Sequence, residues 1–199
     1  MTTDSAGTLP ERVDTLVIGG GTGGCAFANV LAKHSDGSLL LVEAGPDYGS
    51  QSDGAWPDDM LDAWAIPLSH DYDIATAADS SSPRIDLPRA RIIGGCSSHN
   101  GCTASIGAAY EYDEWAALAG DEGWSAERVL PLLEWTRERF RVSHTTMAEL
   151  TPPQRAFVEA GNAAGLPLDF DLDDIAAGPG IGPMPVNIVG GVRWNAAFA

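Results

Sequence analysis

The sequence is poor in positive charge, with 11 Lys and Arg residues against 28 Asp and Glu residues and a net charge of −17. An acidic excess of this size disfavours non-specific binding to nucleic acid or to anionic membrane surfaces. No apolar run approaches the length of a membrane span, and residues 1–12 lack the apolar centre of a signal peptide. These absences predict an ordinary soluble protein.

Cysteine is also scarce. Cys25, Cys96 and Cys102 cannot all pair with one another, and their spacing matches no common zinc pattern. We interpret all three as small buried thiols of a cytoplasmic protein.

Glycine, by contrast, is abundant, and its densest cluster follows a short apolar stretch. There, the run Gly19-Gly-Gly21-Thr22-Gly-Gly24 predicts a strand, a turn and a helix that opens on small residues. Gly19 permits a tight turn, Gly21 lets backbone approach a pyrophosphate, and Gly24 lets the helix pack closely on the strand. The helix predicted from Thr22 to Lys33 directs its unpaired N–H groups at such phosphates.

A second strand, Leu39 to Val42, ends at Glu43, which lies 19 residues after Gly24. That is close to the roughly 20-residue offset expected for the acid that binds a ribose hydroxyl. An acid here disfavours a 2′-phosphate, so the pattern predicts FAD or NAD rather than NADP. It does not by itself choose between the two.

The chain then becomes aperiodic from residue 45 to residue 88 and is rich in Asp, Ser and Pro. A segment of this length is too long for an idle loop, so it predicts a lid, an excursion over the cofactor or a contact surface. It leads into a second glycine-rich turn, residues 94–101, which the pattern alone identifies only as a second phosphate or cofactor loop.

Apolar periodicity and capping residues predict further helices. Phe27, Val30 and Leu31 are expected on the packing side of the first helix. A short helix is expected over residues 111–118, ending near Gly120. Another helix begins after Ser125, with Val129, Leu132 and Leu133 on its apolar face. A capping box predicts the last helix, over residues 151–164.

Several motifs occur in order along the chain and together resemble one family. They are Gly19–Gly24, Leu-Val-Glu43-Ala-Gly45, Gly94-Gly-Cys-Ser-Ser-His-Asn-Gly101, Tyr112-Asp-Glu-Trp115, Gly123-Trp124 and Leu130-Pro131. The sequence is similar to the amino-terminal part of the glucose–methanol–choline oxidoreductases, which are FAD-dependent alcohol oxidases and dehydrogenases. The resemblance implies an α/β fold. A flexible leader (1–12) would precede an incomplete Rossmann-like FAD-binding domain (13–150) and the start of a truncated substrate-binding domain (151–199).

The resemblance implies FAD as the cofactor, with its pyrophosphate at the first glycine turn, its ribose at Glu43 and its flavin ring at the second turn. The implied cofactor-binding residues are Gly19, Gly21, Thr22, Gly24, Glu43, Gly94, Gly95, Ser97, His99, Asn100 and Gly101. Cys96 and His99 depart from the commonest family pattern and are similar to the choline oxidase subgroup. In that subgroup this histidine is bonded covalently to the flavin 8α carbon, which makes His99 the candidate attachment residue. The alternative is that His99 packs near the flavin or hydrogen-bonds a backbone carbonyl.

The implied reaction is hydride transfer from a choline-like or other small alcohol to flavin N5, with oxygen or a quinone-like carrier as electron acceptor. The catalytic base is expected in the carboxy-terminal part of the family's chains, so we expect an amino-terminal portion without catalytic residues. The resemblance leaves a homodimer open.

Two other classes compete with this interpretation. An NAD-dependent dehydrogenase predicts a conventional βαβ continuation after Glu43. The long aperiodic segment that follows Glu43 argues against this alternative. A non-catalytic nucleotide-binding remnant, or a subunit completed by another chain, stays open.

Overall fold

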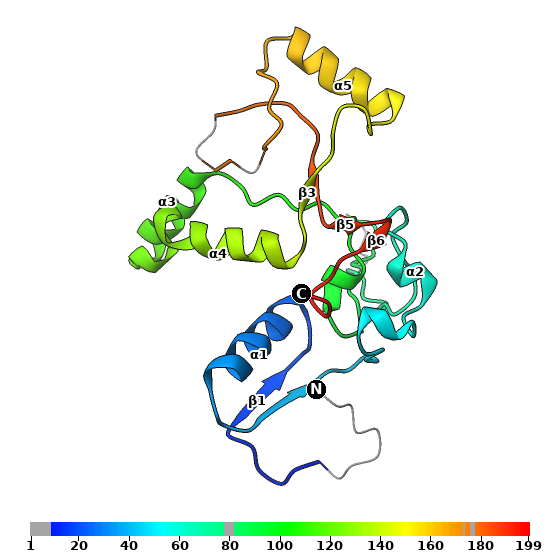
Figure 1. The fold of residues 1–199 in the computed structure, drawn as a ribbon, viewed down its shortest axis with the longest axis vertical. Helices are drawn as coiled ribbons and strands as arrows, with labels where there is room; N and C mark the ends of the chain where they lie inside the picture. The colour runs from blue at the N-terminus through cyan, green and yellow to red at the C-terminus, as the bar shows by residue number, and fades with distance from the viewer. Residues whose placement is uncertain (1–8, 78–81, 173, 176–177) are drawn as a thin grey trace. The chain divides into compact units, whose positions relative to one another are not determined.

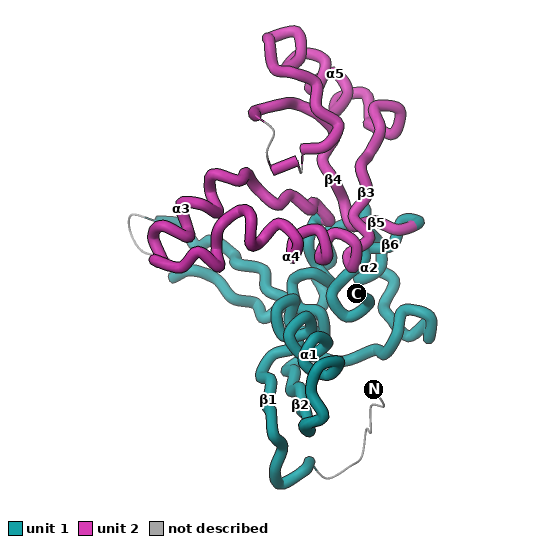
Figure 2. Tube along the Cα trace, turned by 60° about the vertical axis from the view of Figure 1, so that its left-hand side comes forward, with its two compact units in different colours: residues 1–101, 190–199 teal, residues 102–189 magenta. Residues whose placement is uncertain are grey.

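The computed structural model describes residues 9–77, 82–172, 174–175 and 178–199. The chain divides into two compact units, which Figure 2 shows in two colours. Unit 1 comprises residues 1–101 and 190–199, and unit 2 comprises residues 102–189. Each unit is described below by itself.

Unit 1 begins with a strand–helix–strand motif. Strand β1 (Thr15–Ile18) pairs in parallel with β2 (Leu39–Val42), and helix α1 (Thr22–His34) connects the two strands. Figure 1 shows α1 running alongside β1. Parallel strands need such a crossover, because a tight hairpin can join only antiparallel neighbours. The motif confirms the strand, turn and helix predicted from the glycine pattern, and it agrees with the α/β fold that the family resemblance implies.

The packing face of α1 differs from the prediction. Phe27 and Val30 are 55% and 42% exposed, whereas Ala28 is 3% exposed. Gly24 and Ala28 lie four residues apart on one helix face, and their small size lets the helix approach the strands closely. The larger apolar residues consequently fall away from this contact.

Residues 48–61 of the aperiodic segment after Glu43 pack into an apolar core together with residues that follow the segment. It contains two short helices, η1 (Gln51–Asp53) and α2 (Asp58–Leu61). Trp56, Met60, Ala90 and Ile92 are buried together, and Tyr48, Leu61, Ile93, Ala197 and Phe198 pack against them. The segment therefore forms a packed part of unit 1. It leads into the second glycine turn and its short helix η2 (Gly95–Ser98), and strand β6 (Val192–Arg193) completes the unit.

Unit 2 consists mainly of helices. In chain order its elements are α3 (Ala109–Ala119), η3 (Glu122–Trp124), α4 (Ala126–Arg139), β3 (Ser143–His144), α5 (Pro152–Ala163), β4 (Pro185–Val186) and β5 (Ile188–Val189). Strands β3 and β4 pair in antiparallel fashion. Within the described part of the chain, no helix combines the length and apolar character needed to cross a bilayer.

The capping signals of the helices are confirmed. Thr151 donates its N–H and its hydroxyl to Gln154 Oε1, at 2.9 Å and 2.7 Å, and α5 begins at the next residue. Helix α3 ends at Gly120, which adopts the left-handed conformation typical of a C-cap. On the apolar face predicted for α4, Val129 is buried as expected, whereas the prediction for Leu132 is wrong, since this residue is 64% exposed.

Candidate cofactor site

The first glycine turn is as tight as the sequence predicts. Gly19 has a φ of +94°, which L side chains rarely adopt. A Cβ atom at Gly24 would stand 1.9 Å from the Gly19 carbonyl oxygen. Glycine at these two positions therefore lets α1 begin directly against the end of β1.

An open space lies at Gly21, where a Cβ atom would meet nothing within 4 Å. Gly21 is the N-cap of α1, with no side-chain cap, and the first turn of the helix holds no acidic residue. The first N–H groups of a helix lack intrahelical partners and carry its positive dipole end. This uncapped, open end of a 13-residue helix therefore fits the pyrophosphate of a dinucleotide.

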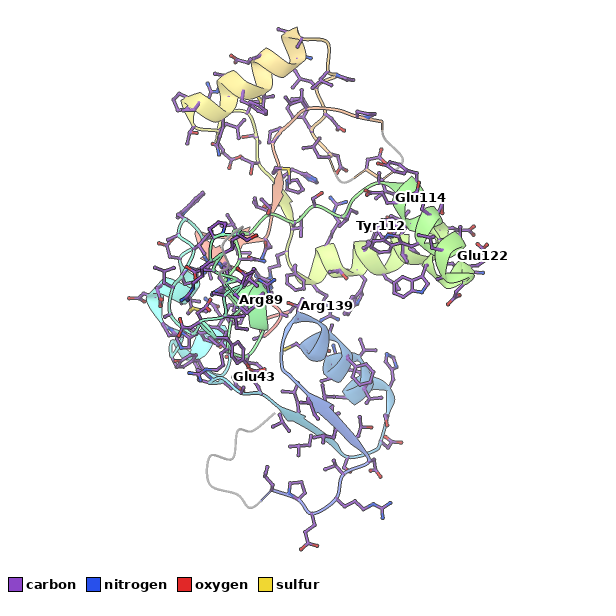
Figure 3. The ribbon with its side chains drawn as sticks, turned by 180° about the vertical axis from the view of Figure 1, so that it is seen from behind. Glu43, Arg89, Tyr112, Glu114, Glu122 and Arg139 are labelled. Atoms are coloured by element: carbon purple, nitrogen blue, oxygen red, sulfur yellow. The ribbon has the colours of Figure 1, made fainter. Side chains whose placement is uncertain are left out.

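Glu43 braces this turn from the end of β2 (Figure 3). Its Oε2 accepts the Gly20 N–H at 2.7 Å, and its Oε1 accepts the Gly45 N–H at 2.9 Å. A carboxylate oxygen has two acceptor positions, so Glu43 can also accept a ribose hydroxyl. Sequence reasoning missed the bracing contacts, which hold the carboxylate in place.

The second glycine turn contacts the first, although some 70 residues separate them. Gly94 donates its N–H to the Gly20 carbonyl at 2.7 Å and accepts the Thr22 hydroxyl at 3.4 Å. A Cβ atom at Gly95 would stand 2.7 Å from the Gly21 Cα atom. The two turns thus form one continuous backbone surface.

The hydroxyl of Ser97 holds the second turn together. Its Oγ donates to the Gly94 carbonyl at 2.6 Å and accepts the Ala196 N–H at 2.9 Å. The Ser97 side chain is buried and its hydroxyl is already engaged within unit 1, so it fixes the shape of the turn.

The cysteines of the two turns lie in different environments. Cys25 is half-buried and its Sγ lies 3.0 Å from the Gly20 carbonyl oxygen, while Cys96 is exposed, so the prediction of a buried Cys96 is wrong. Cys96 projects outward because its neighbours Gly95 and Ser97 supply the buried face of the turn. Burial raises the pKa of the Cys25 thiol, and the carboxylates of Glu43 and Asp47 act in the same direction.

His99 is 5% exposed, and its Nε2 lies 3.2 Å from Asp71 Oδ2. Its recorded side-chain partner is therefore a carboxylate from the long segment before the turn. The backbone N–H of Arg89, labelled in Figure 3, donates to the same oxygen at 3.0 Å. Nothing in the sequence pattern singled out Asp71, because the pairing depends on how the aperiodic segment folds.

Asn100 and Gly101 end the turn on the surface. The Asn100 carbonyl accepts Nε of Arg193 at 2.9 Å, and the fully buried Arg193 guanidinium also donates to the carbonyls of Met60 and Asp62, at 2.6 Å and 2.7 Å. This side chain ties the turn to helix α2.

Asn195 is a further candidate that the sequence pattern did not reveal. It is fully buried, and its Oδ1 accepts the Ala197 N–H at 2.9 Å. A Cβ atom at Gly94 would stand 3.2 Å from this Oδ1, so the side chain lies beside the second turn. Its Nδ2 has no hydrogen-bond partner among the described residues. A buried unpaired donor costs about 1–3 kcal/mol, and an acceptor oxygen of a bound cofactor would remove that cost.

All the cofactor-binding residues implied by the sequence lie in unit 1. Among the residues that the structure describes, no group of three or more His, Cys, Asp and Glu side chains could hold a metal ion. The two glycine turns, the open N-terminus of α1 and the braced Glu43 define a Rossmann-like dinucleotide-binding protein.

The family model described as GMC oxidoreductase matches residues 13–197. The chain therefore belongs to the GMC oxidoreductase family, whose cofactor is FAD.

Curated relatives agree with this assignment. The oxygen-dependent choline dehydrogenase of Vibrio vulnificus is 30% identical, over 96% of this chain and 36% of the relative. The choline oxidase of Arthrobacter globiformis is 37% identical, over 65% of this chain and 24% of the relative. The match thus spans about a third of the length of the first relative and about a quarter of the second.

Solved structures show the same fold. Pyridoxine 4-oxidase from Mesorbium loti superposes with a TM-score of 0.77 at 25% identity, over 94% of this chain and 38% of that one. A formate oxidase superposes with a TM-score of 0.77 at 22% identity, over 96% of this chain and 37% of that one.

Proposed function

We propose that this chain is the amino-terminal part of an FAD-dependent oxidoreductase that oxidises the CH–OH group of a small alcohol. The observation that carries the proposal is the contact between the two glycine turns, in which Gly94 donates its N–H to the Gly20 carbonyl. FAD has a pyrophosphate and a flavin ring that must be bound at once. A joined surface made of a phosphate-binding turn and the turn that carries His99 suits such a ligand.

When bound, FAD supplies an acceptor for the hydride of the alcohol carbon. The N–H groups at Gly21, Thr22 and Gly24 would bind its pyrophosphate, next to the tight turn at Gly19. Glu43 would accept a hydroxyl of the adenosine ribose.

The second turn would lie along the flavin ring. Backbone N–H groups there can stabilise negative charge that develops on the ring during reduction. Ser97, Asn100 and Gly101 are assigned to this role, with His99 as the candidate for covalent attachment. Gly94 and Gly95 donate their N–H groups to the carbonyls of Gly20 and Ile92, so they would instead let the ring approach the backbone closely. Asn195 would donate its unpaired Nδ2 to a cofactor oxygen near Gly94.

The substrate proposed is a choline-like or other small alcohol, with oxygen or a quinone-like carrier as the electron acceptor. The names of the choline dehydrogenase and choline oxidase relatives support this choice. We assign no catalytic base to residues 1–199. The FAD-binding part at 13–150, the substrate-binding part from 151, a homodimer and a cytoplasmic location are retained as proposals.

FAD binding is tested by titrating the purified chain with FAD and following flavin fluorescence. In the variant Gly21→Val the added side chain would fill the open space at the N-terminus of α1. Since a Cβ atom there meets nothing within 4 Å, the fold should survive while FAD affinity falls by more than about tenfold. Gly23→Ala is the matched control, because its Cβ atom also meets nothing within 4 Å.

Equal loss of affinity in both variants would contradict the assignment of Gly21. A folded chain that binds no FAD would favour a nucleotide-binding remnant or a subunit completed by another chain. Preference for NAD over FAD would favour the dehydrogenase alternative.

A further inference from the structure

Positive charge near the candidate site comes from one short segment. Between residues 34 and 101 the only Lys or Arg side chains are Arg84, Arg89 and Arg91, just before the second glycine turn. Arg84 pairs with Asp86, with 3.3 Å between Nε and Oδ1, and Arg89 donates to the carbonyl of the residue before it at 2.7 Å. Arg91 is exposed, and its guanidinium makes no hydrogen bond or ion pair within the part of the chain that the structure describes. In a chain with a net charge of −17, such a cation is a candidate for binding an anion.

The backbone of Arg91 lies against the end of the site that holds Glu43. A Cβ atom at Gly45 would stand 2.0 Å from the Arg91 carbonyl oxygen, and Glu43 accepts the N–H of the same glycine at 2.9 Å. The neighbours of Arg91 in sequence, Ala90 and Ile92, are buried in the apolar core of unit 1. Side chains alternate along an extended segment, so the guanidinium lies on the face away from this core. Arg91 therefore presents an exposed positive charge beside Glu43.

The first glycine turn lies in a negative field. Burial raises the pKa of the Cys25 thiol, and the carboxylates of Glu43 and Asp47 raise it further. Cys25 belongs to the first turn of α1, so the same two carboxylates act on any phosphate bound there. A pyrophosphate is itself negative and is repelled by them, and a nearby cation offsets this repulsion.

We propose that Arg91 binds the pyrophosphate of the dinucleotide and adds a full positive charge to the partial charge at the N-terminus of α1. The inference rests on the proposed function, in which the first turn and Glu43 hold the adenosine half of FAD. A guanidinium is planar and can donate two parallel N–H groups to the oxygens of one phosphate. The backbone N–H groups of the first turn would fix the position of the pyrophosphate, and Arg91 would neutralise part of its charge.

ADP tests Arg91 independently of the flavin, because it carries the pyrophosphate and the adenosine ribose alone. Affinities are measured by isothermal titration calorimetry of the purified chain at about 0.1 M salt. Arg91→Gln should bind ADP and FAD about tenfold more weakly than the unaltered chain, and Arg91→Lys should lie between the two because it lacks the planar group. The control Arg84→Gln removes the same charge from the same segment, at a side chain already paired with Asp86, and should leave both affinities unchanged.

The salt dependence separates a charge contact from a structural role. Screening shortens the range of electrostatic interactions from about 10 Å at 0.1 M salt to about 3 Å at 1 M salt. The loss of ADP affinity in Arg91→Gln should therefore shrink to less than about threefold at 1 M salt. An unchanged ADP affinity in Arg91→Gln, an equal loss in Arg84→Gln, or a loss that persists at 1 M salt would overturn the inference.

The two ligands also separate this inference from the proposed function. An unaltered chain that binds ADP but not FAD, with the loss for ADP in Arg91→Gln, would uphold the role of Arg91 and overturn the proposed function. A chain that binds FAD, with ADP affinity unaffected by Arg91→Gln, would uphold the proposed function and overturn the role of Arg91. A folded chain that binds neither ligand would overturn both.

Discussion

Unit 1 holds its candidate site by two different means. The phosphate region (residues 14–45) is braced by residues close in sequence, such as Gly20 with Glu43 and Gly45 with Glu43, which are 23 and 2 residues apart. The histidine region comprises Asp71, His99, Arg193 and Asn195. Asp71 and His99 are 28 residues apart, but the contacts of Arg193 reach much further along the chain, 93 residues to Asn100 and 133 residues to Met60.

The difference affects what each region tolerates. Besides the Glu43 carboxylate, the phosphate region depends on side chains being absent at Gly24 and Gly45, since backbone atoms occupy the space that a Cβ atom would need there. The histidine region depends on polar side chains being present, because buried carbonyl groups would otherwise lose their donors. Substitutions should therefore act by steric conflict in the first region and by unpaired polar groups in the second.

The largest effect is expected at Arg193 in the histidine region. Arg193→Met removes the guanidinium donors to the carbonyls of Asn100, Met60, Asp62 and Ala65, so the free energy of unfolding should fall by about 3 kcal/mol or more. Arg193→Lys keeps the charge but lacks the planar guanidinium group, so its stability should lie between that of Arg193→Met and that of the unaltered chain. Urea denaturation measures both. A Met variant as stable as the unaltered chain would contradict the role assigned to this side chain.

The next largest effect is expected at Gly24, where the phosphate region has no room for a side chain. Gly24→Ala places a Cβ atom 1.9 Å from the Gly19 carbonyl oxygen and should destabilise the fold by about 1–3 kcal/mol. In Gly23→Ala the Cβ atom meets nothing within 4 Å, and alanine favours the helix, so stability should rise by up to about 1 kcal/mol. Thermal unfolding of the two variants measures this difference in stability. Similar losses of stability in both would contradict the steric conflict assigned to Gly24.

The phosphate region was largely predictable because its chemistry is local. Gly19 and Gly24 were assigned from spacing alone, since one tight turn and one close contact dictate glycine. Capping residues such as Thr151 and Gly120 could also be predicted from the sequence, because their roles depend on nearby residues. The same local reasoning predicted that Phe27 would pack, which was wrong because Ala28 makes the contact.

The partners in the histidine region could not be predicted from the sequence. His99 was identified by family resemblance, but Asp71 and Asn195 were not, because their roles arise from where an aperiodic segment and a remote turn come together. Periodicity carries no information on such contacts. The prediction of a buried Cys96 failed for a similar reason. The exposure of Cys96 depends on which of its neighbours face the interior, and the sequence pattern does not show this.

Cys25 and Cys96 follow the first and second glycine turns in this order, and the two thiols should differ in reactivity. Cys25 is half-buried and Cys96 is exposed, so iodoacetamide should modify Cys96 first at pH 8. Burial raises the pKa of the Cys25 thiol, so its reactive thiolate fraction is small at that pH and grows only at higher pH. Peptide mapping by mass spectrometry against time checks the order. Faster modification of Cys25 would contradict the environment described for α1.

The smallest effect concerns the start of the phosphate region, where Asp14 Oδ2 accepts the Ser38 hydroxyl at 2.7 Å and the Ser38 N–H at 2.8 Å. These hydrogen bonds lower the pKa of Asp14 below its ordinary value of 3.8, and the bond from the Ser38 hydroxyl contributes most. A carboxyl group whose pKa is lowered by folding adds stability above its unfolded pKa, and that stability is lost as pH falls through the folded pKa. Asp14→Asn should therefore be slightly less stable than the unaltered chain at neutral pH, and the gap should close in the acid range. The control Asp36→Asn should show no gap, and a difference for Asp14→Asn that persisted at low pH would mean that the charge of Asp14 is not what holds the two strands.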